Sequence, residues 1–281
     1  MSARPPVFRF APSPNGRLHL GHAYSALLNA EMAGRMHGRL LVRIEDIDPT
    51  RCRPDLAEAM LADLRWLGLR FEEPVRRQSD HLAAYAAALA SLQARGLVYP
   101  CLCSRREIAQ ASIGRDPDGA PLYPGTCRGR ADVAERVAAG TPHAWRLDMR
   151  AARAACPEPL CVDTADAAGT PGRRPADPER WGDAVLGRKD VPTSYHLAVV
   201  LDDAAQGVTH VVRGQDLEAA TDLHRLLQRL LGLPSPRYHH HALLRDPDGE
   251  KLAKSRGSPS LADLRAQGVT ADDIRRQLGF P

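Results

Sequence analysis

Residues 7–22 read VFRFAPSPNGRLHLGH, an apolar segment that leads through a loop rich in proline and glycine to two histidines. Residues 7–11 alternate as a strand does, and Pro12 and Pro14 end that strand. From about Gly21 onward the spacing of the apolar residues predicts a helix. A strand, a loop containing glycine and a helix together form the unit from which parallel α/β sheets are built.

The alternation of strand and helix continues along the chain. Residues 40–44 predict a second strand, which runs into the acidic sequence EDIDPT. Residues 54–68 form the clearest amphipathic helix, and residues 80–95 repeat the helical signal. This order predicts an α/β fold with a parallel sheet. It also places the loop after residues 7–11 at the carboxyl end of its strand, where such folds bind nucleotides.

The middle of the chain has a different character. Residues 96–190 hold five of the six cysteines, are rich in Pro, Gly and Ala, and show poor helical periodicity, so we expect an inserted module with long loops. The α/β pattern then resumes, because residues 196–203 and 209–214 predict strands and residues 216–232 predict a helix. A polar loop follows residue 245 and leads to short helices.

The composition is that of an ordinary globular protein, since 43% of the 281 residues are hydrophobic and 26% are charged. A net charge of +4 permits a nucleic-acid partner without requiring one. The start of the chain has no apolar signal segment, and no stretch approaches the roughly 18 apolar residues of a membrane span. We therefore expect a cytoplasmic protein with reduced cysteines and no membrane partner.

The HLGH sequence has the features of a phosphate site. A helix N-terminus carries unsatisfied N–H groups and a partial positive charge, which attract phosphate. His19 and His22 are three residues apart and would project from the same side of a helix, and Gly21 would allow close approach to the backbone. Lys251 and Lys254 of the KLAKS sequence could neutralise a triphosphate. The alternative is that these histidines and lysines are ordinary solvated side chains.

Together, APSPNGRLHLGH and KLAKS resemble the HIGH and KMSKS signatures of the class I aminoacyl-tRNA synthetases. The segments RFAPSPNG, RIEDIDPTR, SYHLAVVLDD, VTHVVRGQDL and EKLAKS further resemble the catalytic domain of glutamyl-tRNA synthetases, and the likeness covers nearly the whole chain. Several motifs in a fixed order are much more specific than any one of them. The chain departs from the signatures at Leu20, Leu252 and Ala253 but keeps both histidines and both lysines.

The resemblance implies a Rossmann-like class I synthetase catalytic domain that is interrupted by an insert. Residues 1–95 and 191–245 would be the two halves of the catalytic domain. Residues 96–190 would be an inserted module resembling those that bind the tRNA acceptor end. Residues 246–281 would hold the KLAKS loop and a short C-terminal helical segment, without an anticodon-binding domain.

The resemblance also implies the chemistry. ATP, accompanied by Mg²⁺, would activate glutamate to glutamyl-adenylate, and the acyl group would then pass to RNA. The ATP-binding residues would be His19, Gly21, His22, Lys251 and Lys254. Of these, His19 and His22 would stabilise the pentacovalent phosphate, and Lys254 would hold the leaving phosphates.

A glutamate pocket needs both cationic and anionic partners. Arginine suits a carboxylate because its fork can bind both oxygens, and Arg9 and Arg213 both lie near the ends of predicted strands. Glu45 follows the second strand and could bind the ammonium group, although each of the three could instead form a structural ion pair. The pocket that the resemblance implies consists of Arg9, Phe10, Ala11, Pro12, Ser13, Glu45, Tyr195 and Arg213.

Three cysteines of the expected insert suggest one structural Zn²⁺ site. Cys101, Cys103 and Cys127 supply three thiolates, whereas a structural zinc site takes four ligands. The resemblance favours Tyr123 as the fourth ligand, and His143 or a water is the rival. Buried reduced cysteines without a metal are the alternative. No role is assigned to the remaining cysteines, which are Cys52, Cys156 and Cys161.

The length of the sequence bears on the acceptor. Glutamyl-tRNA synthetases carry a further helical domain that reads the anticodon, whereas only 26 residues follow Ser255 here. The best match is the short branch of the family, which activates glutamate without tRNA and esterifies it to queuosine in the anticodon loop of tRNA(Asp). A fragment of a glutamyl-tRNA synthetase that charges the tRNA 3′ end and a catalytically inactive RNA-binding paralogue are the alternatives. We favour a monomer.

Overall fold

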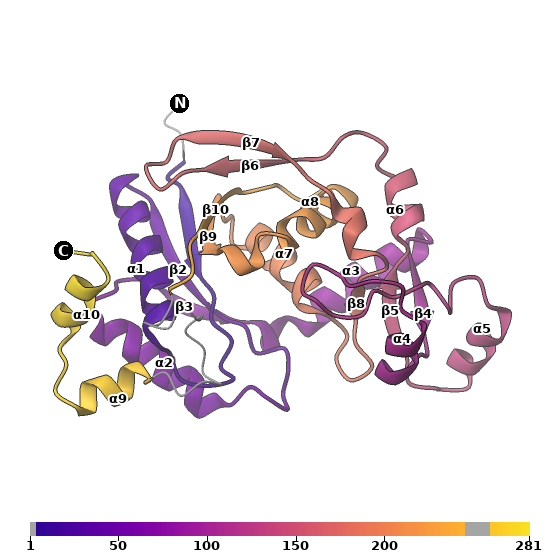
Figure 1. The fold of residues 1–281 in the computed structure, drawn as a ribbon, viewed down its shortest axis with the longest axis horizontal. Coiled ribbons are helices and arrows are strands. Elements are labelled where there is room, and N and C mark those ends of the chain that lie inside the picture. Colours follow the sequence, from indigo (N-terminus) through magenta and orange to yellow (C-terminus); the bar gives the residue numbers. More distant parts are fainter. Residues whose placement is uncertain (1–3, 245–258) are drawn as a thin grey trace.

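The computed structural model describes residues 4–244 and 259–281 (Figure 1). Lys251, Lys254 and the rest of the KLAKS sequence lie outside the described residues. The helices are α1 (Leu20–Arg35), α2 (Pro54–Trp66), α3 (Leu82–Ala94), α4 (Arg105–Ala111), α5 (Ala131–Ala138), α6 (Met149–Ala154), α7 (Tyr195–Ala205), α8 (Ala220–Leu231), α9 (Leu261–Ala266) and α10 (Ala271–Gln277), with short 3₁₀ turns η1 (Gln78–His81), η2 (Pro178–Trp181) and η3 (Gln215–Leu217). The strands are β1 (Val7–Phe10), β2 (Arg39–Ile44), β3 (Glu72–Arg77), β4 (Val98–Cys101), β5 (Ala144–Leu147), β6 (Cys161–Ala165), β7 (Pro171–Pro175), β8 (Val185–Gly187), β9 (His210–Gly214) and β10 (Arg237–His241).

A seven-stranded sheet with the order β3-β2-β1-β9-β10-β6-β7 organises the molecule. Its strands run parallel except β7, which pairs antiparallel with β6. From β1 the chain moves to one side through β2 and β3, whereas β9 and β10 lie on the other side. The order therefore reverses between β1 and β9, and in open α/β sheets the ligand crevice opens at the carboxyl ends of the strands at such a point.

The α/β fold class predicted from the sequence is confirmed. The expected strands at 7–11, 40–44 and 209–214 correspond to β1, β2 and β9, and the helices expected over 54–68 and 80–95 correspond to α2 and α3. The helix expected from residue 216 begins four residues later, because the turn η3 precedes α8. Among the described residues, none of the helices is long and apolar enough to cross a membrane.

The prediction of a strand over residues 196–203 is wrong, because they lie in helix α7, which packs against α3 and α8. The helix buries a continuous apolar run at 197–200, and a short run of this kind has no period that distinguishes a buried helix from a buried strand. Asp202 and Asp203 in its last turn are buried as well, and both form ion pairs. These ion pairs connect α7 to strand β2.

The segment expected to be an insert contributes to two sheets. Strands β4, β5 and β8 form a separate antiparallel sheet, with α4 and α5 beside it at the right of Figure 1. Strands β6 and β7 belong to the large sheet instead, where β6 pairs with β10. The segment thus leaves the large sheet after β3 and returns to its opposite edge.

The last two helices pack against the N-terminal part of the chain, as Figure 1 shows. Leu261, Ile274 and Phe280 are buried in the core that α1, α2 and the first strands build. The backbone N–H of Leu261 donates to the carbonyl oxygen of Leu18 at 2.8 Å, and the neighbouring residues Ser260 and His19 form an isolated β-bridge. The start of α9 is thereby held directly beside the HLGH sequence.

Candidate functional site

The strand order brings the sequence-predicted residues to one edge of the sheet. β1 ends at Phe10 and leads into the loop that contains Ser13, and β2 ends directly before Glu45. Arg213 lies near the carboxyl end of β9. Tyr195 is the first residue of α7, and its hydroxyl lies 3.1 Å from Nη1 of Arg213. Residues that are far apart in the sequence therefore meet at the reversal point of the sheet.

The two histidines of HLGH cap helix α1. The backbone N–H of Gly21 donates to Nδ1 of His19 at 3.1 Å, and the backbone N–H of His19 donates to Nδ1 of His22 at 3.2 Å. The ring centroids are 3.9 Å apart. Since each Nδ1 accepts a hydrogen bond, each neutral ring carries its proton on Nε2, the tautomer that can donate to a phosphate oxygen.

Gly21 lies in close contact with the cap itself. A Cβ atom at this position would lie only 3.0 Å from Cε1 of the His19 ring. A larger residue would require this ring to shift by a few tenths of an ångström at the N-terminus of α1, where the backbone N–H groups and the helix dipole favour anions. The glycine thus keeps an imidazole and a helix N-terminus in one small volume.

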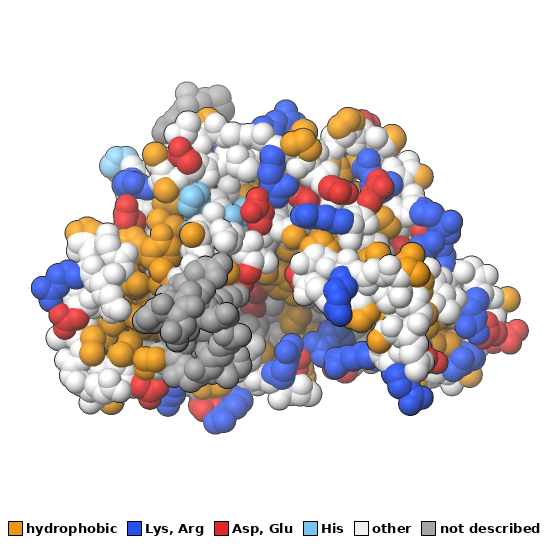
Figure 2. Space-filling model, viewed as in Figure 1, with side chains coloured by type: hydrophobic (Ala, Val, Ile, Leu, Met, Phe, Trp, Pro, Cys, Tyr) orange, Lys and Arg blue, Asp and Glu red, His pale blue; other side chains and the backbone are white. Residues whose placement is uncertain are grey.

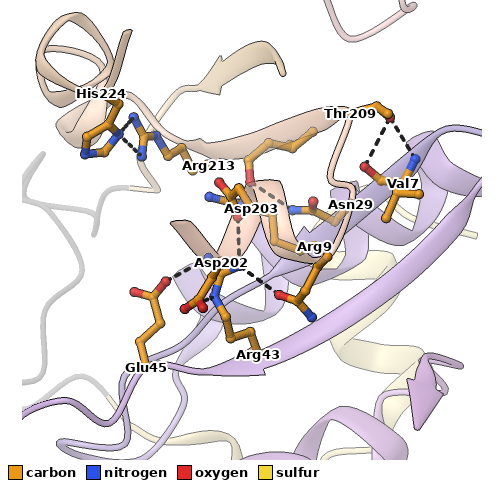
Figure 3. A network of polar contacts seen from close by, with 12 residues as sticks. Val7, Arg9, Asn29, Arg43, Glu45, Asp202, Asp203, Thr209, Arg213 and His224 are labelled. Carbon is orange, nitrogen blue, oxygen red and sulfur yellow. Dashed lines mark hydrogen bonds and ion pairs between the residues drawn. The ribbon is translucent and has the colours of Figure 1, made fainter. Parts of the chain in front are cut away.

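Arg9 and Glu45 both take part in a buried network around Arg43, which Figure 3 shows. Nη1 of Arg43 donates to Asp203 at 2.8 Å, and its Nη2 donates to Glu45 at 3.1 Å. Nε of Arg9 donates to the same carboxylate of Asp203 at 3.2 Å. Asp202 lies 3.7 Å from Nε of Arg43. Arg9 and Glu45 therefore do form structural ion pairs, which were the sequence-based alternative to a glutamate pocket.

Burial and charge compete within this network. Burial raises the pKa of Glu45 above its usual range, although the guanidinium groups of Arg43 and Arg9 act in the opposite direction. Burial also acts to raise the pKa of Asp203, but Arg9 and Arg43 together outweigh it, so that this pKa is lowered. The network therefore keeps Asp203 ionised, whereas the surroundings of Glu45 disfavour its charge.

Arg213 is buried among neutral groups. Within the described residues no carboxylate oxygen lies within 4.0 Å of its guanidinium nitrogens, and its partners are the hydroxyls of Tyr195 and Thr221, the carbonyl oxygen of Leu217, and ring nitrogens of His224 and His240. Its guanidinium carbon also lies 5.5 Å from the centre of the Tyr238 ring. Because buried charges are normally paired, this guanidinium is suited to receive the carboxylate of a ligand.

Sequence reasoning missed several residues of this edge. Arg43 and Asp203 hold the predicted residues Arg9 and Glu45, and the acidic pair at the end of the run VVLDD was the signal that could have revealed them. Cys52 was assigned no role, yet its Sγ lies 3.6 Å from Oγ of Ser13. We find no sequence signal for that contact.

The three cysteines of the expected zinc site lie together. The Sγ atoms of Cys101, Cys103 and Cys127 are all within 4.8 Å of one another. Zinc–sulfur bonds of about 2.3 Å in a tetrahedron place the sulfurs roughly 3.8 Å apart, so the cluster fits the metal. The hydroxyl of Tyr123 lies 3.8 Å from Sγ of Cys103 and accepts the backbone N–H of Cys127 at 2.8 Å. His143 is not part of the cluster.

The protonation of these thiols is uneven. Burial raises the pKa of Cys103 to about 11. Burial acts in the same direction on Cys127, but hydrogen bonds from the Tyr123 hydroxyl and the backbone of Leu102 lower the pKa of this thiol. These hydrogen bonds favour the thiolate of Cys127, which is the form that binds a metal.

A second cavity lies beside the place where Tyr195 and Arg213 meet. It has a volume of about 660 Å³ and lies between the first residues of α7 and the segment around α4. Its lining includes Tyr195, His196 and Trp181, together with Ile108 and Ala109 of α4. Tyr195 therefore borders both this cavity and the surroundings of Arg213.

Comparisons with known proteins place this geometry in a family. The family model of the class I tRNA synthetases (E and Q), catalytic domain, matches residues 7–278. A "Glutamyl-Q tRNA(Asp) synthetase" of Rhodobacter capsulatus is 50% identical, over 98% of this chain and 100% of the relative. A protein of the same name from Symbiobacterium thermophilum is 45% identical, over 97% of this chain and 85% of the relative.

Solved structures show the same fold. A glutamate tRNA ligase from Elizabethkingia meningosepticum, crystallised in complex with its amino acid, superposes with a TM-score of 0.71 at 24% identity. The match covers 94% of this chain but 53% of that one, so the chain spans about half the length of the solved protein. With the model match over residues 7–278 and relatives at 45–50% identity, the chain belongs to the class I tRNA synthetases (E and Q) through their catalytic domain.

Proposed function

We propose that this chain uses ATP to activate glutamate without tRNA, and then transfers the glutamyl group to queuosine in the anticodon loop of tRNA(Asp). The observation that carries the proposal is the buried guanidinium of Arg213, which has only neutral partners among the described residues. The relatives with matching names over 98% and 97% of the chain supply the acceptor.

Arg213 binds the side-chain carboxylate of glutamate in this proposal. A carboxylate held by a buried guanidinium is a poor nucleophile, so the α-carboxylate is left to react. Glu45, with Arg43 behind it, receives the ammonium group, whose positive charge offsets the cost of burying that carboxylate. Arg9, Ser13 and the backbone of Phe10, Ala11 and Pro12 complete the pocket.

Activation is a displacement at phosphorus. An oxygen of the α-carboxylate attacks the α-phosphorus of ATP, the bond from that phosphorus to the bridging oxygen breaks, and pyrophosphate leaves. His19 and His22 donate Nε2–H bonds to the phosphate as charge develops, and Gly21 allows their packing at the start of α1. Lys251 and Lys254 neutralise the leaving phosphates. The family implies ATP with Mg²⁺, to which we assign no protein ligand.

The segment around α4 and α5 is suited to RNA. Figure 2, drawn in the same view as Figure 1, shows many Lys and Arg side chains over this part of the molecule. Phosphate contacts of this kind hold a nucleic acid in place without reading its sequence. The exposed cations on it include Arg105, Arg106, Arg130, Arg136 and Lys189.

Two assays test the function in order. Glutamate-dependent ATP–pyrophosphate exchange without tRNA tests activation. Transfer of radiolabelled glutamate to tRNA(Asp), with and without queuosine, tests the acceptor. Label that requires queuosine and persists after removal of the 3′-terminal nucleotide is expected. Label that appears without queuosine, or that is lost with the 3′ end, would overturn the acceptor assignment and favour charging of the 3′ end.

We further propose that Cys101, Cys103 and Cys127 bind one structural Zn²⁺, with Tyr123 as the fourth ligand. Metal analysis of the purified protein is expected to give about one zinc per chain. Cys127→Ser should lose the metal, whereas Cys161→Ser, a cysteine of β6 outside the cluster, should retain it. Full zinc content in Tyr123→Phe would mean that another group is the fourth ligand. Wild-type protein without zinc would refute the site.

A further inference from the structure

Two histidines extend the surroundings of Arg213 toward the second cavity. Nδ1 of His224 lies 3.5 Å from both Nη atoms of Arg213, as the dashed lines in Figure 3 mark. Nε2 of the same ring lies 3.1 Å from Nδ1 of His196. His196 in turn lines the cavity, and its ring makes edge contacts with those of Trp181 and Tyr195 at interplanar angles of 70° and 62°. The three side chains thus form a line from the pocket to the cavity.

The direction of every proton in this line follows from the chemistry of arginine. A guanidinium can only donate, so Nδ1 of His224 must accept and carries no proton. A neutral His224 therefore holds its proton on Nε2 and donates it to Nδ1 of His196. His196 must then hold its own proton on Nε2. The relay runs one way, from Arg213 through His224 to an N–H donor on His196.

Burial keeps both rings neutral, which the relay requires. His224 is 1% exposed, and burial, reinforced by the positive charge of Arg213, lowers its pKa well below the usual range. Burial and Arg213 likewise lower the pKa of His196 to about 4. A second proton on His196 would place two N–H groups against each other across the 3.1 Å contact, and a second proton on His224 would place its Nδ1–H against the guanidinium of Arg213. The uncharged form is therefore the one present at neutral pH.

We propose that His224 and His196 form a relay of neutral imidazoles in which His224 positions Arg213 for the glutamate carboxylate and His196 presents Nε2–H to a hydroxyl oxygen of the acceptor nucleoside in the second cavity. The role of His196 rests on the acceptor proposed above, whereas the tautomers of the two rings do not depend on it. In this arrangement His224 is a positioning residue. His196 touches the acceptor and is a specificity-determining residue of the second step.

The first test reads the tautomers directly in the full-length wild-type protein. Two-bond ¹H–¹⁵N correlation spectra distinguish a protonated from an unprotonated ring nitrogen. We expect the Nε2–H form for His196 and His224 at neutral pH. A protonated Nδ1 on either ring would overturn the relay even if the enzyme is fully active. This measurement needs no substrate, so it is independent of the proposed function.

The second test separates the two steps. His224→Phe should raise KM for glutamate in ATP–pyrophosphate exchange by about 10–100-fold with a smaller change in kcat, because a hydrogen bond to a charged group is lost. His224→Asn, which retains an acceptor, should restore part of the loss. His210→Phe is the matched control, since this buried histidine lies at the opposite end of β9 and stacks on Phe8. Equal KM values in His224→Phe and His210→Phe would contradict the positioning role.

The distal histidine is tested in the transfer step. His196→Phe should slow transfer from preformed glutamyl-adenylate to queuosine-containing tRNA(Asp) by about tenfold, with exchange affected less, and His196→Gln should restore transfer. A cavity-filling variant provides a second readout. Ala109→Trp should block transfer, whereas Ala111→Trp, on the same exposed helix but away from the cavity, should not.

The outcomes distinguish this inference from the function itself. Wild-type protein that activates glutamate but labels no queuosine-containing tRNA(Asp) would refute the proposed acceptor. Wild-type protein that transfers normally, together with an Ala109→Trp variant as fast as Ala111→Trp, would refute the cavity as the place of the acceptor. Equal slowing of exchange and transfer by His196→Phe would refute the separate role of His196.

Discussion

Two buried arginines flank strand β1 at the same edge of the sheet, and they have opposite surroundings. Arg43, on β2, lies within 4.0 Å of carboxylate oxygens of Glu45, Asp202 and Asp203. Arg213, on β9, has only hydroxyls, a carbonyl oxygen and neutral imidazoles among its described partners. Both guanidinium groups are buried, but among the described residues only Arg43 has carboxylate partners (Figure 3).

The difference indicates what each cation does. A buried arginine that is surrounded by carboxylates holds elements together, here β2 and helix α7. A buried arginine among neutral acceptors is oriented without being neutralised, so its charge stays available for a ligand. Burial alone, or the residue type alone, would not separate these two roles.

The largest expected effect is on activity, at Arg213. Arg213→Met should lower kcat/KM for glutamate in ATP–pyrophosphate exchange by roughly 10²–10⁴-fold, because the carboxylate of glutamate loses its buried countercharge. Thermal unfolding should change little, since no carboxylate among the described residues is left without its partner. Exchange close to that of the wild type would remove Arg213 from the glutamate pocket.

Arg43→Met is the matched variant on the other side of β1. It leaves the carboxylates of Glu45, Asp202 and Asp203 without their shared cation, and breaking a buried pair in this way costs about 3–5 kcal/mol of unfolding free energy. Urea titration measures the loss. If Arg43→Met were as stable as Arg213→Met, the distinction between the two arginines would not hold.

Lowering the pH is expected to affect the neutral histidines near Arg213. The pKa is about 4 for His196 and about 2 for His240, both lowered first by burial and then by Arg213. As the pH falls below about 6.5, the unfolded chain binds protons that the folded chain does not, so the unfolding free energy decreases, and by about pH 4 each of these two groups contributes a loss on the order of 3 kcal/mol.

Urea titrations at several pH values between 7.5 and 4.5 measure this slope. His196→Gln should make the slope shallower, because it removes one of the groups that titrate only in the unfolded chain. Asp203 has a lowered pKa, so its contribution is lost only at more acidic pH and does not enter this window. A stability that stays constant from pH 7.5 to 4.5 would contradict the neutral state of the histidines.

The smallest effect on stability is expected at an arginine that is exposed to water. Arg39, at the amino end of β2, pairs with Glu72 of β3, and both side chains are more than 40% exposed. Glu72→Gln should change the unfolding free energy by less than about 1 kcal/mol, because water screens exposed pairs. A loss as large as that of Arg43→Met would mean that burial is not what separates these sites.

The sequence sufficed for the parts of the fold with a clear period. The alternating residues of β1 and the apolar stripe of α2 gave the α/β class and the edge at which Arg9, Glu45 and Arg213 meet. Helix α7 was missed because residues 197–200 are apolar on every side, and such a run has no period to read.

The partners of the two buried arginines could not be predicted from the sequence. Whether an arginine meets a carboxylate or an imidazole depends on which side chains of distant segments face it. Asp203 is 160 residues from Arg43, and His224 and His240 reach Arg213 only because α8 and β10 fold back against β9. The spacing of residues along the chain does not predict these contacts. The placement of Lys251 and Lys254 stays a prediction, since both lie outside the described residues.

The packing of α9 and α10 against α1 and α2 sets an order of events during synthesis. Leu18 and His19 are made early, but the backbone of Leu261 and Ser260 that pairs with them emerges roughly 240 residues later, on the order of tens of seconds at ribosomal speeds. Until then the N-terminal core lacks Leu261, Ile274 and Phe280. The nascent chain therefore carries the HLGH sequence without its contacts to α9, and these contacts form among the last in the molecule.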